Sequence, residues 1–202
     1  MKSFDLNRIV LVFLFFSATS CVKDDDTALP TMKVPFYSEN FNDASNLGNW
    51  SNVSINGGNL WYISSYGGET FVQLSAYGSG EAEMDAWLIS PAINLDSTEN
   101  EAFSFKYLTG YYNGQAVSVW VSTDYDGSNT AEAINNATWT DMNVNLPIYT
   151  TSGYSSSFSL TDPIDISSYS GDIHIALRYQ GGTTSGVTTT YEIDNLNVYE
   201  NK

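Results

Sequence analysis

The segment EAFSFKYLTG, residues 101–110, alternates side chains so that Phe103, Phe105 and Tyr107 fall on one side of an extended chain. Alternation with a period of two predicts a β-strand with one buried face. The pattern returns in AVSVWVST (116–123), TDMNVNLP (140–147) and DIHIALRY (172–179). Strands of this kind, separated at short intervals by Gly, Asn, Asp or Ser, predict an all-β sandwich or barrel.

No stretch after residue 34 keeps apolar residues at helical spacing over the length of a helix, so no helix is expected there. The alternating segments predict about ten strands. The expected strands start near Phe36, Trp50, Leu60, Phe71, Asp85, Ala102, Ala116, Trp139, Ser157, Ile173 and Thr188. In the last strand the apolar residues face one side up to Ile193 and the other side from Leu196 onward. This change of phase at Asp194 and Asn195 predicts a β-bulge.

The N-terminus has the layout of a bacterial export signal. Lys2 and Arg8 give a basic start, an apolar run (IVLVFLFF, 9–16) follows, and small residues lead to Cys21, the only cysteine. The run is far shorter than the roughly 20 residues that a transmembrane helix needs. Cys21 lies where a lipobox places its lipidated residue, although Ala18 stands in place of the usual leucine three positions earlier.

Residues 1–20 are therefore expected to be a lipoprotein signal peptide, and residues 21–34 an acidic tether behind lipidated Cys21. Lys23 and the aspartates after it resemble the surface-export signal of Bacteroidetes lipoproteins. That resemblance implies a protein of the outer membrane, exposed on the cell surface and lipid-anchored. The alternative is an ordinary cleaved signal peptide with an unmodified cysteine. Residues 35–202 are long enough for one domain with a sizeable core.

Acidic residues dominate the charge of the chain, with 23 Asp and Glu against 7 Lys and Arg and a net charge of −16. Such a surface repels nucleic acid and anionic lipid headgroups. Nucleic acid is therefore not an expected partner, and the membrane is expected to be contacted through the lipid anchor only. Where carboxylates converge, the same charge favours calcium.

Four segments together resemble a known family: FYSENFND (36–43), DAWLISPAINL (85–95), AFSFKY (102–107) and YEIDNLNVYE (191–200). Their order is similar to that of the choice-of-anchor J and cleaved-adhesin domains of Bacteroidetes surface proteins, which are themselves MAM-like. The resemblance spans about residues 36–200. It implies an all-β, galactose-binding-like jelly-roll β-sandwich of two antiparallel sheets, with roles in adhesion, glycan contact or support of a catalytic domain.

The resemblance also implies one structural Ca²⁺ where the first and last strands meet. The matching positions are Glu39 and Asp43 in the opening segment and Asp194 at the expected bulge, with Asp85 as a fourth. Calcium takes six to eight oxygen ligands, and a bulged strand exposes carbonyl groups that can supply some of them. The alternative is that these residues are solvated acids of a very acidic protein.

Outward-facing aromatic residues suggest a glycan-binding face. Trp120 lies on the side opposite the apolar residues of its strand, and Trp139 shares a side with polar residues. Tyr111 and Tyr112 lie in a glycine-flanked loop, and Tyr66 precedes two glycines. Aromatic rings stack on the apolar faces of sugars while amides and acids bind the hydroxyls. The alternative is that these aromatics cover the outer surface of a sheet.

The sequence offers little for catalysis. His174 is the only histidine, it is expected at the surface on the polar side of its strand with Arg178, and no G-x-S-x-G motif occurs. The expected function is therefore that of a cell-surface, non-catalytic binding or adhesion module, with a glycan as the first candidate ligand. The alternatives are a structural or assembly subunit that binds another surface protein, and a glycoside hydrolase.

Overall fold

The computed structural model describes residues 33–43, 46–147 and 152–201. The expected signal peptide, Cys21 and nearly all of the tether lie outside the described residues. No helix in those three ranges is long and apolar enough to cross a membrane.

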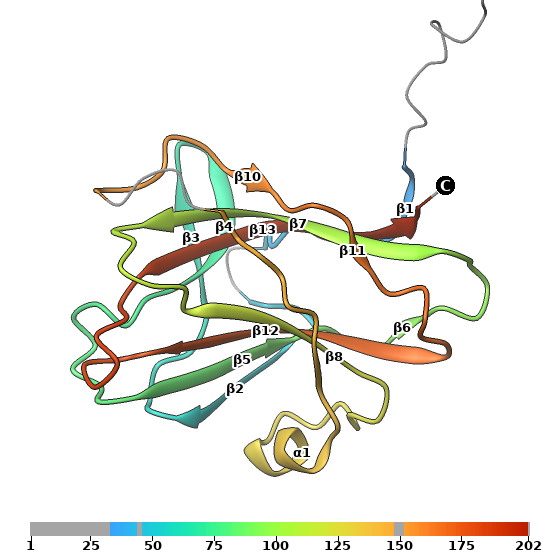
Figure 1. Ribbon diagram of the computed structural model, residues 1–202, viewed down its shortest axis with the longest axis horizontal. Coiled ribbons are helices and arrows are strands. Elements are labelled where there is room, and N and C mark those ends of the chain that lie inside the picture. Colours follow the sequence, from blue (N-terminus) through green and yellow to red (C-terminus); the bar gives the residue numbers. More distant parts are fainter. Residues whose placement is uncertain (1–32, 44–45, 148–151, 202) are drawn as a thin grey trace, which may run out of the picture. The chain divides into compact units, whose positions relative to one another are not determined.

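Two antiparallel sheets form a jelly-roll β-sandwich, which confirms the expected fold (Figure 1). The upper sheet in Figure 1 has the order β10-β7-β13-β4-β3, with β1 on β13 and β11 on β7. Its strands are β1 (Pro35–Glu39), β3 (Tyr62–Tyr66), β4 (Glu69–Leu74), β7 (Glu101–Gly110), β10 (Ser159–Leu160), β11 (Ile164–Asp165) and β13 (Thr190–Glu200).

The lower sheet has the order β2-β5-β12-β8-β9, with β6 on β12. Its strands are β2 (Ser51–Asn56), β5 (Met84–Ile89), β6 (Ile93–Asn94), β8 (Val117–Ser122), β9 (Thr140–Asp141) and β12 (Asp172–Gly181). A short helix, α1 (Ala131–Asn136), lies beyond this sheet on the side away from the upper one (Figure 1).

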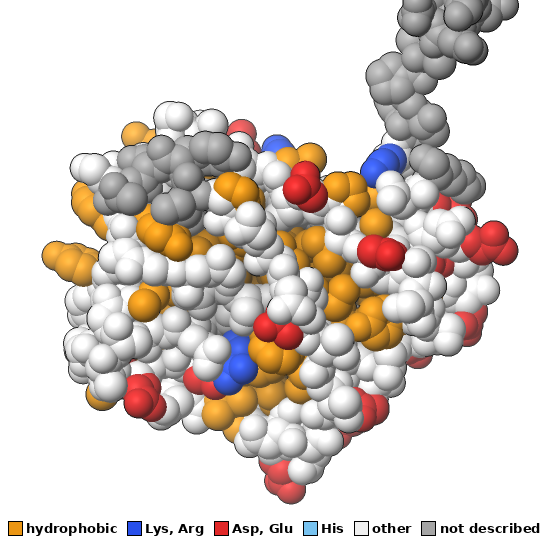
Figure 2. Space-filling view, viewed as in Figure 1, with side chains coloured by type: hydrophobic (Ala, Val, Ile, Leu, Met, Phe, Trp, Pro, Cys, Tyr) orange, Lys and Arg blue, Asp and Glu red, His pale blue; other side chains and the backbone are white. Residues whose placement is uncertain are grey.

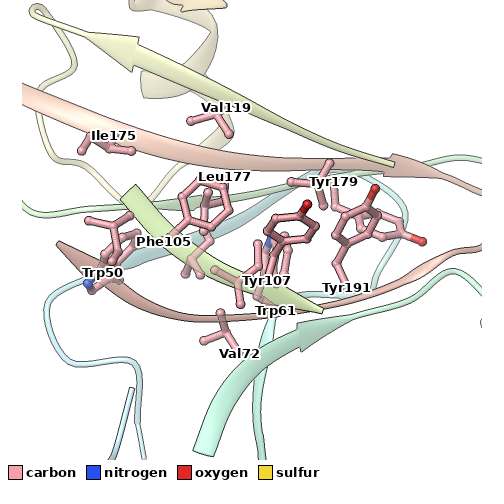
Figure 3. Packing of buried hydrophobic residues seen from close by; sticks show 14 of the residues in the cluster. Trp50, Trp61, Val72, Phe105, Tyr107, Val119, Ile175, Leu177, Tyr179 and Tyr191 are labelled. Carbon is pink, nitrogen blue, oxygen red and sulfur yellow. The ribbon is translucent and has the colours of Figure 1, made fainter. Parts of the chain in front are cut away.

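The apolar residues of the alternating segments meet between the sheets. Phe103, Phe105 and Tyr107 of β7 and the inward valines of β8 are buried, as the alternation predicts. Figure 3 shows aromatic rings from both sheets interleaved in this core, among them Trp61, Tyr107 and Tyr179. Burial of so many large side chains is the main stabilising contribution to the sandwich.

The predicted bulge is confirmed. The register between β13 and β7 shifts between Asp194 and Asn197, and Asn195 has a positive φ of 50°. Up to Ile193, β13 pairs with β4, and from Leu196 onward it pairs with β1 on the same edge. The bulge therefore lies where the strand exchanges one neighbour for another, and it keeps the apolar side facing inward across that exchange.

Four parts of the chain differ from the sequence-based expectation. The helix α1 is only six residues long, with Thr130 as its N-cap, and so is too short to show helical periodicity. The strands β6 and β11 have two residues each and lie beside longer strands. The alternating segment 140–147 contributes only the two residues of β9, although Leu146 still reaches the core.

Candidate functional site

A groove of about 930 Å³ lies on the outer face of the upper sheet. Its floor crosses β3, β4, β13 and β7, and residues 154–158, just before β10, form one wall. Four neighbouring strands at about 4.8 Å spacing give a floor roughly 14 Å across, which suits a short chain better than a single small molecule. The lining residues are Ser64, Ser65, Tyr66, Gly67, Glu69, Phe71, Gln73, Lys106, Leu108, Tyr154, Ser155, Ser156, Ser157, Phe158, Glu192 and Asp194.

The strand register sets one row of side chains across the outer face from β3 to β7, and three of its members, Gln73, Glu192 and Leu108, line the groove. Tyr62 pairs with Gln73, Gln73 with Glu192, and Glu192 with Leu108. The Gln73 amide nitrogen donates a 2.6 Å hydrogen bond to the Tyr62 hydroxyl. Side chains directly opposite one another in antiparallel strands are near neighbours. Residues up to 130 positions apart in the chain, Tyr62 and Glu192, thus line one surface.

Glu192 is the central group of this row. Its side chain is only 7% exposed, and among the described residues no donor hydrogen-bonds to its carboxyl group. Burial disfavours the charged form and raises the pKa of Glu192 from 4.5 to about 7. Near neutral pH this carboxyl group therefore holds a proton for much of the time, and it can both donate and accept a hydrogen bond.

Asp194 is the second buried acid of the floor. It is 4% exposed, its Oδ2 accepts a 2.6 Å bond from the Asn195 amide, and its Oδ1 has no hydrogen-bond partner in the described part of the chain. Burial raises the pKa of Asp194, an effect that Lys106 partly offsets. Leaving a buried acceptor unsatisfied is costly, so Oδ1 marks a position that calls for a donor.

The wall of the groove is held to β7 at Gly110. The Tyr154 ring lies directly on this glycine, because a Cβ atom there would come within 2.6 Å of the ring. Backbone bonds from the Tyr111 amide to the Gly153 carbonyl and from the Ser155 amide to the Thr109 carbonyl fix the segment on either side. Glycine at 110 thus allows an aromatic ring to stand at the edge of the groove.

Aromatic rings surround the polar floor. Phe158 of the wall packs on Phe71 of β4 with ring centroids 5.7 Å apart, so the wall reaches across β13 to β4. Tyr66 also lines the groove and is 84% exposed. Exposed rings beside buried acids and an amide are the combination that sugars need, since rings stack on their apolar faces and polar groups bind their hydroxyls.

The predicted ligand-binding residues divide between this groove and other places. Tyr66 lines the groove, and Tyr111 packs edge-on against Tyr154 at its margin, with centroids 5.6 Å apart. Tyr112 is half-buried and does not line the groove. Trp120 and Trp139 lie on the opposite sheet, so the structure does not bring the five residues together.

Trp120 on β8 points outward from the sheet, as predicted, and Trp139 lies just before β9, but both pack around Trp87. The ring centroids are 6.1 Å and 5.0 Å from that of Trp87. The indole nitrogens of Trp120 and Trp139 donate to the Ser118 hydroxyl and to the Ile134 carbonyl of α1. This arrangement favours the alternative reading in which these rings cover the sheet.

The four predicted calcium ligands are not gathered at one point. Both oxygens of Glu39 accept hydrogen bonds, from the Phe41 amide and the Trp50 indole, and Asp43 accepts one from Asn46. Asp194 is close enough to Glu39 for that charge to help raise its pKa. Asp85 lies on the other sheet. The described residues hold no group of three or more His, Cys, Asp or Glu placed for a metal ion, so calcium stays a prediction.

His174 differs from its expected surface position, because it is buried. Its Nδ1 lies 2.8 Å from the Ser90 carbonyl, and its ring packs edge-on against Tyr125. The chain after β8 folds over this part of the lower sheet and covers a residue that alternation alone places outside. His174 borders a second, more polar pocket of about 630 Å³.

Most of the groove was missed in the sequence. The alternation that places Tyr191 and Ile193 inward also puts Glu192 and Asp194 on one outer side, so these two acids were within reach of the pattern. Tyr62, Gln73 and Tyr154 carried no such signal, since their meeting depends on strand pairing between distant segments.

Fold and groove define the class of the protein, an all-β jelly-roll domain with an open groove on one outer face. Its family follows from the sequence: the chain belongs to the family described as a domain of unknown function (DUF5017), which matches residues 79–201. No curated protein matches the chain.

Solved structures of similar fold include adhesin domains and carbohydrate-binding modules. The K1 cleaved adhesin domain of Lys-gingipain from Porphyromonas gingivalis W83 is 16% identical, with 82% of this chain and 98% of that chain covered and a TM-score of 0.50. The K2 domain of Lys-gingipain is 14% identical, with 80% and 96% covered and a TM-score of 0.54. TmCBM61, solved with β-1,4-galactotriose, is 12% identical, with 80% and 94% covered and a TM-score of 0.42.

Identities this low show the fold alone. The similarity to cleaved-adhesin domains is thus confirmed at the level of the fold. Membership of the choice-of-anchor J family stays a prediction, because the family that matches is DUF5017.

Proposed function

We propose that this protein is a non-catalytic binding module that holds a glycan in the groove of the upper sheet. The observation that carries the proposal is the pairing of Gln73 with Glu192 on the floor, bordered by the exposed rings of Tyr66 and Tyr154. Polar groups below and rings at the sides match the two kinds of surface on a sugar. An open groove also suits a polymer that enters from the side.

The proposal includes a place of action. The signal sequence and Cys21 support a lipid anchor at the outer membrane, and the acidic run behind Cys21 supports exposure on the cell surface. A glycan module in that position would gather polysaccharide at the cell. Cys21→Ser is expected to release the protein from the membrane fraction into the soluble fraction, and retention in the membrane fraction would contradict the anchor.

A glycan array tests the binding itself. The protein should retain a defined set of glycans, and Tyr66→Ala and Tyr154→Ala should each weaken this binding by about tenfold or more, since a stacking ring is lost. Tyr77→Ala is the matched control, because Tyr77 is 82% exposed and lies outside the groove.

Two other outcomes would point elsewhere. An array without signal, together with capture of a surface protein that Tyr66→Ala disrupts, would support the assembly role instead. Release of reducing ends from a bound polysaccharide, lost in Glu192→Gln, would show a glycoside hydrolase.

A further inference from the structure

We propose that the groove selects glycans without acid groups, because its floor presents two buried carboxyl groups that call for hydrogen-bond donors. This inference rests on the proposed function and adds to it the chemical class of the ligand. It concerns the charge of the sugar, which neither the fold nor the family specifies.

The ionisable groups of the groove are unevenly balanced. Three acids, Glu69, Glu192 and Asp194, line it together with one base, Lys106. Within the described ranges the sole ion pair joins Arg178 to Asp85 on the other sheet, so no cation lies within salt-bridge distance of the groove acids. A uronate or sulfate entering the groove would meet more acids than bases, and the one base, Lys106, is exposed to water and salt, which weaken its attraction for an anion.

The polar atoms of the floor call for donors. Asp194 Oδ1 is buried without a partner in the described structure, and Glu192 has no donor either. The Gln73 amide nitrogen already donates to Tyr62. A sugar hydroxyl can donate to the Asp194 carboxylate and can both donate to and accept from the Glu192 carboxyl group, whereas a carboxylate on the ligand can only accept.

The surroundings of Glu192 contain one base and two further acids. The neighbouring groups are the Tyr62 hydroxyl on β3, Gln73 and Glu69 on β4, Lys106 and Leu108 on β7, Tyr154 on the wall, and Asp194 on its own strand. Lys106 is exposed and pairs in register with Asp194. Water and salt therefore screen its charge more than the buried acids are screened, and the floor stays an acceptor surface.

Affinity electrophoresis on matched polysaccharides tests the inference. The pairs are hydroxyethylcellulose with carboxymethylcellulose, dextran with dextran sulfate, and carboxyl-reduced polygalacturonan with polygalacturonan. At about 0.15 M salt, where the field of distant surface charges is largely screened, the full-length protein should be retarded by at least one neutral member and about tenfold less by its acidic counterpart.

Two variants separate the groove from the overall charge. The double variant Glu192→Gln with Asp194→Asn should bind the neutral probe more weakly and lose the discrimination against the acidic one. The control, Glu99→Gln with Asp162→Asn, changes the net charge equally at exposed positions outside the groove and should behave as the parent protein.

Each outcome decides something. Equal or stronger retardation by the acidic members, or discrimination that survives in the double variant, overturns the inference and leaves glycan binding standing. No retardation by any polysaccharide, with a silent array, overturns the inference and the proposed function together. The comparison of neutral and acidic probes on the parent protein needs no variant, so a variant that fails to fold does not affect it.

Discussion

The two outer faces of the sandwich carry the same kinds of side chain, aromatic rings and carboxylates, but differ in what those side chains contact. On the lower sheet, Asp85 accepts bonds of 2.8 Å and 2.6 Å from Arg178 and a third from the Trp87 indole. The Arg178 guanidinium lies 4.9 Å from the Trp87 ring. On the upper sheet, Asp194 and Glu192 are more deeply buried and have fewer partners.

This difference in partners separates a face whose side chains pack against the protein from a face whose side chains are left to bind a ligand. The rings of the lower face are covered by α1 and its flanking loops, and the acid there is neutralised by an arginine. The upper face leaves rings exposed and acids unsatisfied, which lowers stability unless a ligand supplies what is missing. On the side of the molecule seen in Figure 2, acidic side chains are scattered and basic ones are few.

The largest expected effect on stability comes from removing a packed ring on the outer face of the lower sheet. Trp87→Ala removes the ring on which Trp120, Trp139 and Arg178 all pack, and should lower the free energy of unfolding by about 3–5 kcal/mol. Urea unfolding followed by circular dichroism measures it. Glycan binding, measured well below the unfolding transition, should be unchanged, and a loss of binding there would break the division between the two faces.

The two aspartates should respond in opposite directions to the same change. Asp85→Asn leaves Arg178 without its counter-charge in a mostly buried place and should cost about 1–3 kcal/mol. Asp194→Asn removes a charge that burial disfavours, and should leave stability unchanged or raise it at pH 8. Equal destabilisation of both variants would mean that Asp194 is a structural acid like Asp85.

The pH dependence of stability should come from the groove face. The pKa of Glu192 is raised from 4.5 to about 7 in the folded protein, so the folded state binds more protons than the unfolded state between these values. The free energy of unfolding should therefore fall as pH rises from about 4.5 to 7 and level off above. Glu192→Gln should remove this part, about 1–2 kcal/mol once screening by water in the groove is allowed for.

The comparison that checks it is a set of urea titrations from pH 4 to pH 8 on the parent protein and on Glu192→Gln. Other acids contribute equally to both proteins and cancel in the difference. If the two curves run parallel, Glu192 is ionised normally in the folded state, and the account of Glu192 as a largely protonated carboxyl group near neutral pH fails.

The sequence predicts the strands of both faces but not what lies over them. Alternation is a local signal, so it located the strands, the inward residues and the bulge at Asp194. It also showed correctly that Trp120 faces outward, but it could not show that α1 and the loop before Trp139 cover that face. The covering of the lower sheet by α1 and the formation of the groove on the upper sheet both depend on contacts between distant segments, which a local pattern does not show.

The groove depends on register between distant strands. Tyr62, Gln73 and Glu192 become neighbours only because β3, β4 and β13 are adjacent in one particular alignment. A slip of one residue would turn these side chains to the other face. The local pattern of a single sequence gives no information on that alignment. Tyr66 was found because exposed tyrosines beside glycines stand out without any pairing.

The smallest expected effect on stability, and the sharpest test of the wall, is Gly110→Ala. The added Cβ atom would meet the Tyr154 ring at 2.6 Å, and because the ring is half exposed, we expect it to move outward. Stability should change by no more than about 1 kcal/mol, while glycan binding should weaken as in Tyr154→Ala, because the stacking ring leaves its place.

Isothermal titration with a glycan from the array measures the affinity of both single variants and of the double variant. If glycine acts only through the ring, Gly110→Ala should have no further effect once Tyr154 is alanine, so the two losses should not add. Additive losses would mean that the backbone at Gly110 contacts the ligand itself, and the wall would then be β7 and not the tyrosine that rests on it.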